Sequence, residues 1–268
     1  MITAKMVQEL REKTGAGMMD CKKALTAADG DMTLAIENLR KSGAAKAEKK
    51  SGRATNQGKV WTSIGDDAAS IVEVLCETDF AAKTDKFGNL VKTIADSALK
   101  AAGEGDVTVA VNEAEKTTLT DHIGVIGENM QIRRAARWNR AEGCAFASYH
   151  HMDGRVSVLV EVEGESDPVV LNDICLHIAA FSPKYISETD VPAEVIAKKE
   201  IAAAADPKLA NKPAAMLDKI LAGKIRKYFS EVCLMDQPWV KDDKTTLAKF
   251  RPNLKVRRFI RWEVGEEL

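Results

Sequence analysis

The sequence predicts an α+β fold with an N-terminal three-helix module, two related α/β core subdomains and an inserted helical hairpin. Three observations support this fold class. Apolar residues recur every three or four positions over residues 3–42, as they do in amphipathic helices. From residue 59 onward, β-branched strands alternate with apolar helices. An eight-residue pattern then occurs twice, which indicates an internal repeat.

Three short helices are predicted within residues 3–42. Thr3 can cap the first helix, and the turn at residues 15–17 ends it. Gly30 suits the end of the second helix, and Asp31 suits the start of the third. The apolar residues at helical spacing are Met6, Val7 and Leu10, then Met18, Cys21, Leu25 and Ala28, then Met32, Ala35, Ile36 and Leu39. A unit at residues 1–42 buries little surface, so we expect a docking module.

A basic linker is expected at residues 43–57. Within residues 40–53, six basic residues stand against the single acid Glu48, with small residues between them. The basic residues are Arg40, Lys41, Lys46, Lys49, Lys50 and Arg53. Charge runs without aromatic residues are usually solvated, so a tether is favoured over a basic contact strip.

A first core subdomain, N, is predicted at residues 58–140. Val60–Ile64 and Ala69–Cys76 have the β-branched composition of strands. A helix over about 84–101 carries its apolar residues on one side, a shorter helix follows at about 118–128, and Gln131–Asn139 forms the next strand.

The repeat lies at residues 72–79 and 160–167. Both segments read V-E-V-x-x-E-[ST]-D, and each is a strand that ends in an acid and a hydroxyl residue before an apolar helix. The second helix carries Val170, Ile174, Leu176, Ile178 and Ala179. A second core subdomain, C, is therefore predicted at residues 141–189 and 230–268.

Residues 190–229 interrupt the α/β alternation and predict an inserted antiparallel helical hairpin. Asp190 and Pro192 start its first helix, and Asp206-Pro207 with Pro213 mark its turn. The second helix carries an apolar stripe at Met216, Leu217, Ile220, Leu221, Ile225, Tyr228 and Phe229. Strands return near Val232–Leu234 and Val256–Val264. A homodimer through the hairpin is an open alternative.

Composition limits the class of protein. The chain has 39 basic and 40 acidic residues, so its net charge of -1 disfavours a nucleic-acid-binding protein. Its five cysteines are scattered without a C-x-x-C pair, which fits free thiols in a reducing cytosol. We expect no signal peptide and no membrane span, and therefore a cytoplasmic protein.

Motifs for catalysis or metal binding are lacking in the sequence. The four histidines are His122, His150, His151 and His177, and none has a ligand spacing such as H-E-x-x-H. The adjacent pair His150-His151 would point to opposite faces of a strand. Walker, G-x-S-x-G and G-x-G-x-x-G motifs do not occur. The sequence therefore predicts a protein that is no enzyme and uses neither cofactor nor metal.

Two segments are candidates for binding another protein. In the second helix, Met19 and Lys22 lie on a different face from Cys21 and Leu25, and an exposed methionine adapts to irregular partner surfaces. From the residues alone, a partly covered surface methionine is nevertheless the favoured interpretation.

The second candidate is the strand-to-helix turn at residues 77–83, E-T-D-F-A-A-K. Phe80 could be exposed there beside Asp79. Spacing alone favours a structural interpretation, in which Phe80 packs under the next helix and Thr78 or Asp79 caps that helix.

Four segments resemble one protein family. Residues 14–25, T-G-A-G-M-M-D-C-K-K-A-L, are very similar to the N-terminal signature of bacterial elongation factor Ts, and this motif is highly specific. Thr78-Asp79-Phe80 resembles the family's second signature, and residues 127–134, G-E-N-M-Q-I-R-R, resemble a third. Residues 259–266, F-I-R-W-E-V-G-E, resemble its last core strand. The resemblance runs in order over essentially the whole chain.

The resemblance implies an exchange factor for elongation factor Tu, the GTPase that delivers aminoacyl-tRNA. Contacts with the GTPase domain would come from the N-terminal residues Arg11, Met18, Met19 and Lys22. Asp79 and Phe80, flanked by Thr78 and Ala81, would intrude near the bound magnesium. Ile126 and Gly127 would lie near the phosphate loop, and His151 and Val240 would be further contacts.

Two features depart from the family pattern. The family often has Val after Thr-Asp-Phe, whereas this chain has Ala81, and we expect Phe80 to keep its role. Some members carry a C-terminal helical module, and this sequence stops at Leu268, so we expect any contact from that module to be absent.

Two rival functions follow from other features. Arg133, Arg134, Arg137, Arg140, Arg257, Arg258 and Arg261 lie near Trp138 and Trp262, so an RNA-binding, ribosome-associated protein is the first alternative. Small three-helix modules such as the UBA-like module expected at residues 1–42 also occur in ubiquitin-type adaptors, which are the second.

Overall fold

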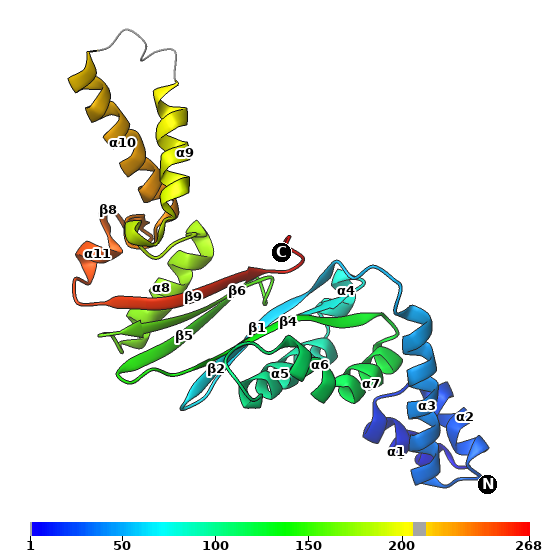
Figure 1. The fold of residues 1–268 in the computed structure, drawn as a ribbon. Coiled ribbons are helices and arrows are strands. Elements are labelled where there is room, and N and C mark those ends of the chain that lie inside the picture. Colours follow the sequence, from blue (N-terminus) through cyan, green and yellow to red (C-terminus); the bar gives the residue numbers. More distant parts are fainter. Residues whose placement is uncertain (1, 206–212) are drawn as a thin grey trace. The chain divides into compact units, whose positions relative to one another are not determined.

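The structure is a computed structural model that describes residues 2–205 and 213–268. It mixes helices and sheets and divides into two compact units (Figure 1). The first unit comprises residues 1–139, 150–157 and 262–268, and the second comprises residues 140–149 and 158–261. The chain therefore enters the second unit after residue 139, returns to the first unit over residues 150–157, and returns to it again at residues 262–268.

The first unit begins with three helices, as predicted: α1 (Ala4–Thr14), α2 (Met18–Ala27) and α3 (Met32–Lys50). The predicted caps are confirmed, because Thr3 accepts the N–H of Met6 and Asp31 accepts that of Leu34. The small core of these helices consists of Val7, Leu10, Cys21, Ala24, Leu25, Ala28 and Ala35. Met18, which was assigned to the inner stripe, is exposed instead, because it opens α2 beside the turn.

The prediction of a basic tether after residue 42 is wrong for most of its length. α3 continues to Lys50, since alanine and lysine have high helix propensity and Gly43 lets the helix pack closely on α7. A Cβ built on Gly124 of α7 would lie 3.0 Å from the Cα of Gly43, so a side chain at position 124 would crowd the backbone of α3. The basic strip is thus an ordered helix beside the core of the first unit (Figure 1).

The larger part of the first unit is a four-stranded sheet in the order β1-β2-β4-β3. Its strands are β1 (Gln57–Ile64), β2 (Ala68–Cys76), β3 (Gly105–Asp106) and β4 (Met130–Asn139). β1 and β4 both pair antiparallel with β2. Its helices are α4 (Asp79–Ala82), α5 (Asp85–Lys100), α6 (Thr108–Ala114) and α7 (Lys116–Ile126). The predicted strands and long helix are confirmed.

The hydrophobic core of this sheet lies under α5. Phe87, Leu90, Val91 and Ile94 of α5 are buried against Val72 and Val74 of β2, as their spacing predicted. The sequence analysis missed α6, because its β-branched residues resemble a strand. The side chain of Asp106 accepts the N–H of Thr108 and so starts this short helix.

The second unit is built on a three-stranded sheet in the order β5-β6-β9. Its elements are β5 (Cys144–His151), β6 (Val156–Glu163), α8 (Pro168–Phe181) and β9 (Lys255–Glu263). Val158, Val160 and Val162 of β6 form a core with α8, in which Val170, Ile174 and Ile178 are buried as predicted. β5 was not foreseen.

The remaining elements follow α8: η1 (Glu188–Asp190), α9 (Ala193–Ala204), α10 (Ala214–Val232), β7 (Pro238–Trp239), β8 (Asp242–Thr246) and α11 (Leu247–Phe250). The two expected helices are present and contact each other, whereas the predicted turn at Asp206-Pro207 lies outside the described residues. The strand predicted at Val232–Leu234 is wrong, because α10 continues to Val232 and only Cys233 forms a single bridge, with Tyr185.

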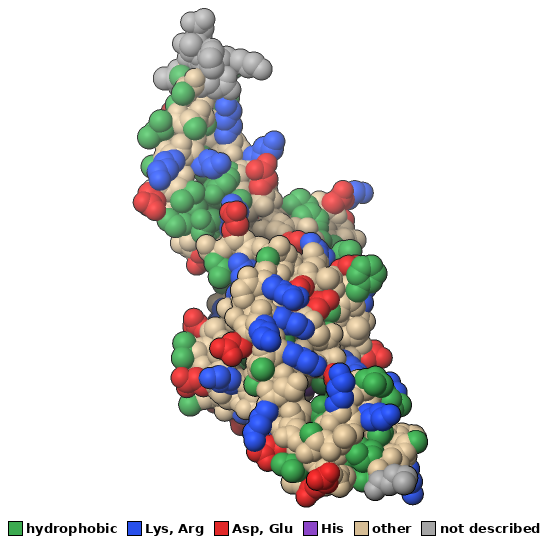
Figure 2. Space-filling model, turned by 90° about the vertical axis from the view of Figure 1, so that its right-hand side faces the viewer, with side chains coloured by type: hydrophobic (Ala, Val, Ile, Leu, Met, Phe, Trp, Pro, Cys, Tyr) green, Lys and Arg blue, Asp and Glu red, His purple; other side chains and the backbone are tan. Residues whose placement is uncertain are grey.

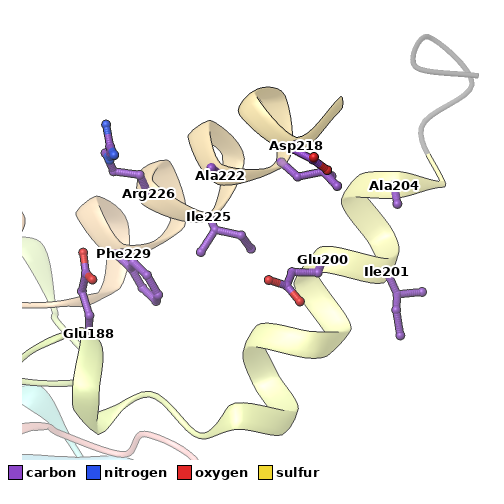
Figure 3. Close-up of a pocket in the computed structure, with 10 residues that line it drawn as sticks. Glu188, Glu200, Ile201, Ala204, Asp218, Ala222, Ile225, Arg226 and Phe229 are labelled. Carbon is purple, nitrogen blue, oxygen red and sulfur yellow. The ribbon is translucent and has the colours of Figure 1, made fainter. Parts of the chain in front are cut away.

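The helices α9 and α10 leave apolar side chains at the surface. Ile201 of α9 and Ile225 and Phe229 of α10 are among the residues that line a hollow at these two helices (Figure 3). Ile201 and Met216 are exposed, and hydrophobic side chains show on this part of the surface below the grey residues (Figure 2).

Candidate functional site

The most distinctive surface feature is the turn between β2 and α5. β2 ends at Cys76, and the single helical turn α4 begins at Asp79. Thr78 has extended backbone dihedrals, and its hydroxyl oxygen accepts the N–H of Ala81 over 3.2 Å, as an N-cap residue does. The expectation that Thr78 or Asp79 caps the next long helix is wrong, because Thr78 caps the separate turn α4 and Thr84 caps α5.

Phe80 is 80% exposed on this turn. The interpretation from spacing, in which Phe80 packs beneath the next helix, is wrong. α4 turns its small residues Ala81 and Ala82 into the core, and a helix rotates about 100° per residue, so position 80 faces outward. Burying an aromatic ring is favourable by a few kcal/mol, so the exposed ring can contribute binding energy to a contact with another protein.

Asp79 lies beside Phe80 and is half-exposed. Its carboxylate accepts a hydrogen bond from the Lys83 ammonium over 2.7 Å. This bond and the charge of Lys83 lower the pKa of Asp79 below its usual range. Asp79 therefore remains ionised at neutral pH, and the turn presents a ring and a paired carboxylate together.

The N-terminal candidates lie on the surface of α1 and α2. Arg11, Met18, Met19 and Lys22 are all exposed, with Met18 at 47% and Met19 at 63%. Cys21 and Leu25, on the opposite side of α2, are fully buried. The predicted division of this helix into a core face and a free face is confirmed.

A hydrogen bond connects this helical module to the core of the first unit. Gly15 ends α1 with a φ of 67°, a left-handed conformation that favours glycine. Its carbonyl accepts a hydrogen bond from Lys86 of α5 over 3.0 Å. Arg11, Met18 and Lys86 line one surface hollow, so this face of the helices continues onto α5.

Ile126 and Gly127 lie at the end of α7. Gly127 is exposed with a φ of 89° and donates its N–H to the carbonyl of Ile123, which caps the helix. Ile126 is half-buried and packs on the core beneath α5. Of these two predicted contacts, only Gly127 is exposed.

His150 and His151 end β5 and point to opposite sides, as predicted for neighbours on a strand. His150 stacks on Trp61 with ring centroids 3.8 Å apart, and it bonds to the hydroxyls of Thr62 and Ser157. Burial, followed by the charge of nearby Lys92, lowers its pKa to about 4. His150 is therefore a neutral structural residue, whereas His151 is exposed.

Val240, the last predicted contact, belongs to the second unit. It follows β7, is half-buried and packs on the core around α8. Its N–H donates to Nδ1 of His177 over 3.2 Å. Part of its surface is therefore occupied within its own unit.

The Phe80 turn is held in place by residues that the sequence pattern did not indicate. The carboxylate of Glu128 accepts both the N–H and the hydroxyl of Thr78, and the carboxylate of Glu77 accepts the N–H of Asn129. Glu128 and Asn129 stand in the G-E-N motif of residues 127–129. Their motif was noticed, but no pattern in the sequence indicated that it bonds to a turn 50 residues earlier.

The cysteine side chains are all free and buried, and burial raises the pKa of Cys76 and Cys175 to about 12. Among the residues that the structure describes, no three His, Cys, Asp or Glu side chains are grouped as a metal site. Within those same residues, no helix has both the length and the apolar character required to cross a bilayer.

Comparison with known proteins now decides the family. The family model for Elongation factor TS matches residues 77–266. The chain belongs to the elongation factor Ts family. Elongation factor Ts of Thioalkalivibrio sulfidiphilus is 45% identical over 274 aligned positions, which cover 99% of this chain and 92% of the relative. Elongation factor Ts of Pediococcus pentosaceus is 42% identical over 272 positions, with the same coverage.

The elongation factor Ts match includes the surface described above. The matched range opens at Glu77, so it contains the Phe80 turn and the G-E-N loop that bonds to it. The two relatives also cover α1 to α3, which lie before the range of the family model. The recognition made from four short segments is confirmed.

Proposed function

We propose that this protein is a guanine nucleotide exchange factor for elongation factor Tu in translation elongation. It binds the GDP-bound GTPase, displaces magnesium and lets GDP leave, so that GTP can bind. The observation that carries this proposal is the outward Phe80, 80% exposed beside the paired carboxylate of Asp79 in a member of the elongation factor Ts family.

The proposed contact surface extends over several parts of the chain. Thr78, Asp79, Phe80 and Ala81 form the turn that approaches the magnesium side of the nucleotide site. Further contacts with the GTPase domain come from Arg11, Met18, Met19, Lys22, Ile126, Gly127, His151 and Val240. The exposure of Met18 and Met19 supports this assignment, because methionine adapts its shape to a partner surface.

The mechanism requires no covalent chemistry. GDP is held through its phosphates, magnesium and oriented backbone amides, so displacing magnesium leaves phosphate charge without compensation. The interface must supply this energy, at about 1.4 kcal/mol for each tenfold weakening of GDP. Coupling is reciprocal, so nucleotide weakens the binding of the exchange factor by the same factor. An interface on the order of 2,000 Å² or more fits this demand.

The finer architecture is part of the same proposal. We propose a UBA-like N-terminal module, two related α/β core subdomains and a helical hairpin inserted into the second. The repeat is supported because β2 and β6, which carry the two V-E-V segments, are each the middle strand of the β1-β2-β4 and β5-β6-β9 sets. Each segment places one fully buried glutamate, Glu73 or Glu161, beside arginines of the next strand.

We propose a non-enzymatic protein of the cytoplasm, with no cofactor and no direct contact with nucleic acid or membrane. The five free cysteines fit a reducing compartment. The arginines that suggested RNA binding have internal partners: Arg133 and Arg134 pair with Glu73, Arg257 with Glu163, and Arg258 with Glu161. These ion pairs connect neighbouring strands, so the four arginines are less available to bind RNA than the sequence suggested.

Pairing of two copies through α9 and α10 is a separate proposal about assembly. It is supported by the exposed side chains of Ile201 and Met216. Sedimentation over a range of concentrations tests it, with Ile201→Asp as the variant. A dimer should dissociate in the variant, and a monomer at all concentrations would rule the pairing out.

The decisive experiment measures release of labelled GDP from purified elongation factor Tu. The protein should accelerate release, and Phe80→Ala should slow that accelerated rate by at least about tenfold, equal to about 1.4 kcal/mol of barrier. Because Phe80 acts on the nucleotide site, it should affect the rate more than the affinity for the GTPase. Val169→Ala is the matched control, since Val169 is also exposed at the start of a helix. Equal losses of rate and affinity in Phe80→Ala would count against the magnesium-displacing role.

A further inference from the structure

Two loops that are distant in sequence bond to each other reciprocally next to Phe80. Glu128, which follows α7, accepts the backbone N–H of Thr78 over 3.0 Å and its hydroxyl over 2.6 Å. Glu77, which precedes Thr78, accepts the N–H of Asn129 over 2.6 Å. Each loop thus supplies one carboxylate and donates hydrogen bonds to the carboxylate of the other loop. Hydrogen bonds to carboxylates are among the stronger ones in proteins.

The hydroxyl of Thr78 joins this arrangement to Phe80. It donates its proton to Glu128 and uses a lone pair to accept the N–H of Ala81, the residue after Phe80. One oxygen atom therefore fixes both the start of α4 and its attachment to the loop. α4 spans only Asp79–Ala82, far too short to hold a helical conformation without such partners.

A third segment, at the end of α3, closes the arrangement. The Lys50 ammonium donates to the carbonyl of Gly127, and the Arg53 guanidinium pairs with Glu77 over 3.4 Å. The buried side chain of Asn129 donates to the carbonyls of Arg53, over 2.8 Å, and Ser51. Segments 50–53, 77–78 and 127–129 are thus mutually bonded, and the first of them continues directly from the N-terminal helices.

We infer that Glu128 is a positioning residue for Phe80: its carboxylate fixes the angle at which α4 presents the ring. Phe80 is mostly exposed and has few packing contacts of its own, so its direction depends on the cap at Thr78. The cap in turn depends on Glu128, because Glu128 receives both polar groups of Thr78. This inference rests on the proposed function, in which the direction of Phe80 matters.

A rigid mounting has a physical purpose in such a mechanism. A ring on a loose turn would yield when it meets the partner, and binding energy would go into ordering the turn. A ring held by the three mutually bonded segments 50–53, 77–78 and 127–129 keeps its position relative to the N-terminal contact surface when the partner binds. Displacement of a positioned group by about 1 Å can lower a rate by about a hundredfold.

The test is a double-mutant cycle of Glu128→Ala and Phe80→Ala, read by GDP release and by affinity for nucleotide-free elongation factor Tu. Glu128→Ala should slow the accelerated release by at least about tenfold, with at most about a twofold change in affinity. In the Phe80→Ala background it should add little, because the two residues act as one unit. Glu128→Gln should restore most of the rate, since its amide can still bond to Thr78. Glu113→Ala, at an exposed glutamate of α6, is the matched control.

A second readout uses the free protein and needs no partner. Amide hydrogen exchange over residues 77–83 should become at least about tenfold faster in Glu128→Ala, as expected when a charge-assisted bond is lost, and should stay unchanged in Glu113→Ala. If Phe80→Ala slows release and Glu128→Ala does not, or if the two effects add, the positioning role is overturned. If neither variant slows release while amide exchange quickens in Glu128→Ala, the magnesium-displacing role of Phe80 has failed and the mounting by Glu128 stands. Unchanged amide exchange in Glu128→Ala would overturn the inference that Glu128 holds the Phe80 turn in place.

Discussion

The sheets of the two units contain the same buried ion pair. In the first, Nε of Arg134 on β4 donates to Oε2 of Glu73 on β2 over 2.6 Å. In the second, Nε of Arg258 on β9 donates to Oε2 of Glu161 on β6 over 2.7 Å. Both glutamates are fully buried in the middle strand of their set. A buried glutamate in the V-E-V segment is therefore tolerated because the next strand supplies its arginine.

The correspondence extends to the helices and the strand ends. Nε of Arg137 donates to the carbonyl of Leu99 near the end of α5, and Nε of Arg261 donates to that of Ala179 near the end of α8. Glu73 also accepts the N–H of Gly265, and Glu161 that of Ala141, each three positions after a tryptophan. Residues 132–138 and 256–262 share the pattern [IV]-R-R-x-x-R-W, which joins V-E-V as a second repeated motif.

The two units differ where the V-E-V strand meets its helix. After β6, Asp167 caps α8 directly, and Pro168 occupies the first turn. After β2, the chain makes the extra turn α4 before a second cap at Thr84 starts α5. This extra turn carries Phe80. The comparison indicates that a repeated scaffold supplies rigidity, and that the proposed activity resides in a short addition to one copy.

The largest expected effect on stability comes from removing the two buried glutamates. Glu73→Ala leaves Arg133 and Arg134 without their shared carboxylate, with side chains only 20% and 13% exposed, so we expect a loss of about 3–5 kcal/mol in unfolding free energy. Glu161→Ala removes the carboxylate that pairs with Arg258. The Arg258 side chain is 32% exposed and can be hydrated, so the loss of unfolding free energy should be smaller, at about 1–3 kcal/mol. Urea denaturation followed by circular dichroism measures both.

Glu113→Ala serves as the stability control, because that side chain lies on the surface of α6 and should change little. Equal losses from the two buried glutamates would mean that the second arginine, Arg133, adds nothing to the first sheet. The repeat would then be energetically uniform, and the expected difference in stability loss between the two copies would be wrong.

Much of this fold was predictable because period and composition report burial. The inner face of α5, the caps at Thr3 and Asp31 and the two V-E-V strands follow from local patterns. The length of α3 did not, because its continuation depends on a close contact between Gly43 and Gly124 of α7. The strand expected at Val232–Leu234 failed for a similar reason, since α10 persists through residues of β-branched or apolar character.

The candidate site was harder to predict than the fold. The exposure of Phe80 contradicts the local pattern, in which an apolar residue before a helix packs inward. It was foreseen only through resemblance to the family, and the structure explains it by the inward turn of Ala81 and Ala82. The bonds from Glu128 to Thr78 join positions 50 residues apart, and no local pattern contains such a pair.

A second test compares the hydroxyl residues of the repeat. The Thr78 hydroxyl caps α4 and donates to Glu128, so Thr78→Val should lower the unfolding free energy by about 1–2 kcal/mol. Ser166 is exposed, and in its copy the cap is Asp167, which accepts the N–H of Val169. Ser166→Ala should therefore change stability by less than about 0.5 kcal/mol. Comparable losses of unfolding free energy in both variants would show that the Thr78 hydroxyl stabilises the fold no more than the Ser166 hydroxyl does.

The smallest expected difference concerns pH and the two glutamates before those hydroxyls. The N–H of Asn129 lowers the pKa of Glu77, and the N–H of Asp167, followed by that of Ser166, lowers the pKa of Glu165, both from 4.5. A carboxyl whose pKa is lower in the folded chain stabilises the fold fully above its unfolded pKa. That stabilisation disappears as the pH falls through the lowered value. Each group therefore contributes to acid sensitivity below about pH 4.5.

Glu77→Gln and Glu165→Gln should each make the unfolding free energy fall less steeply below about pH 4.5, which urea titrations between about pH 6 and pH 3 would measure. Both carboxylates are reached by solvent, so the changes should be small and similar. The copies should differ in what else is lost. Glu77 accepts the N–H of Asn129, so Glu77→Ala, which removes the acceptor, should quicken amide exchange in residues 127–129, whereas the bonds of Glu165 to Ser166 and Asp167 stay within one turn. A slowed or unchanged exchange there would mean that the mounting of the Phe80 turn does not depend on this half of the reciprocal pair.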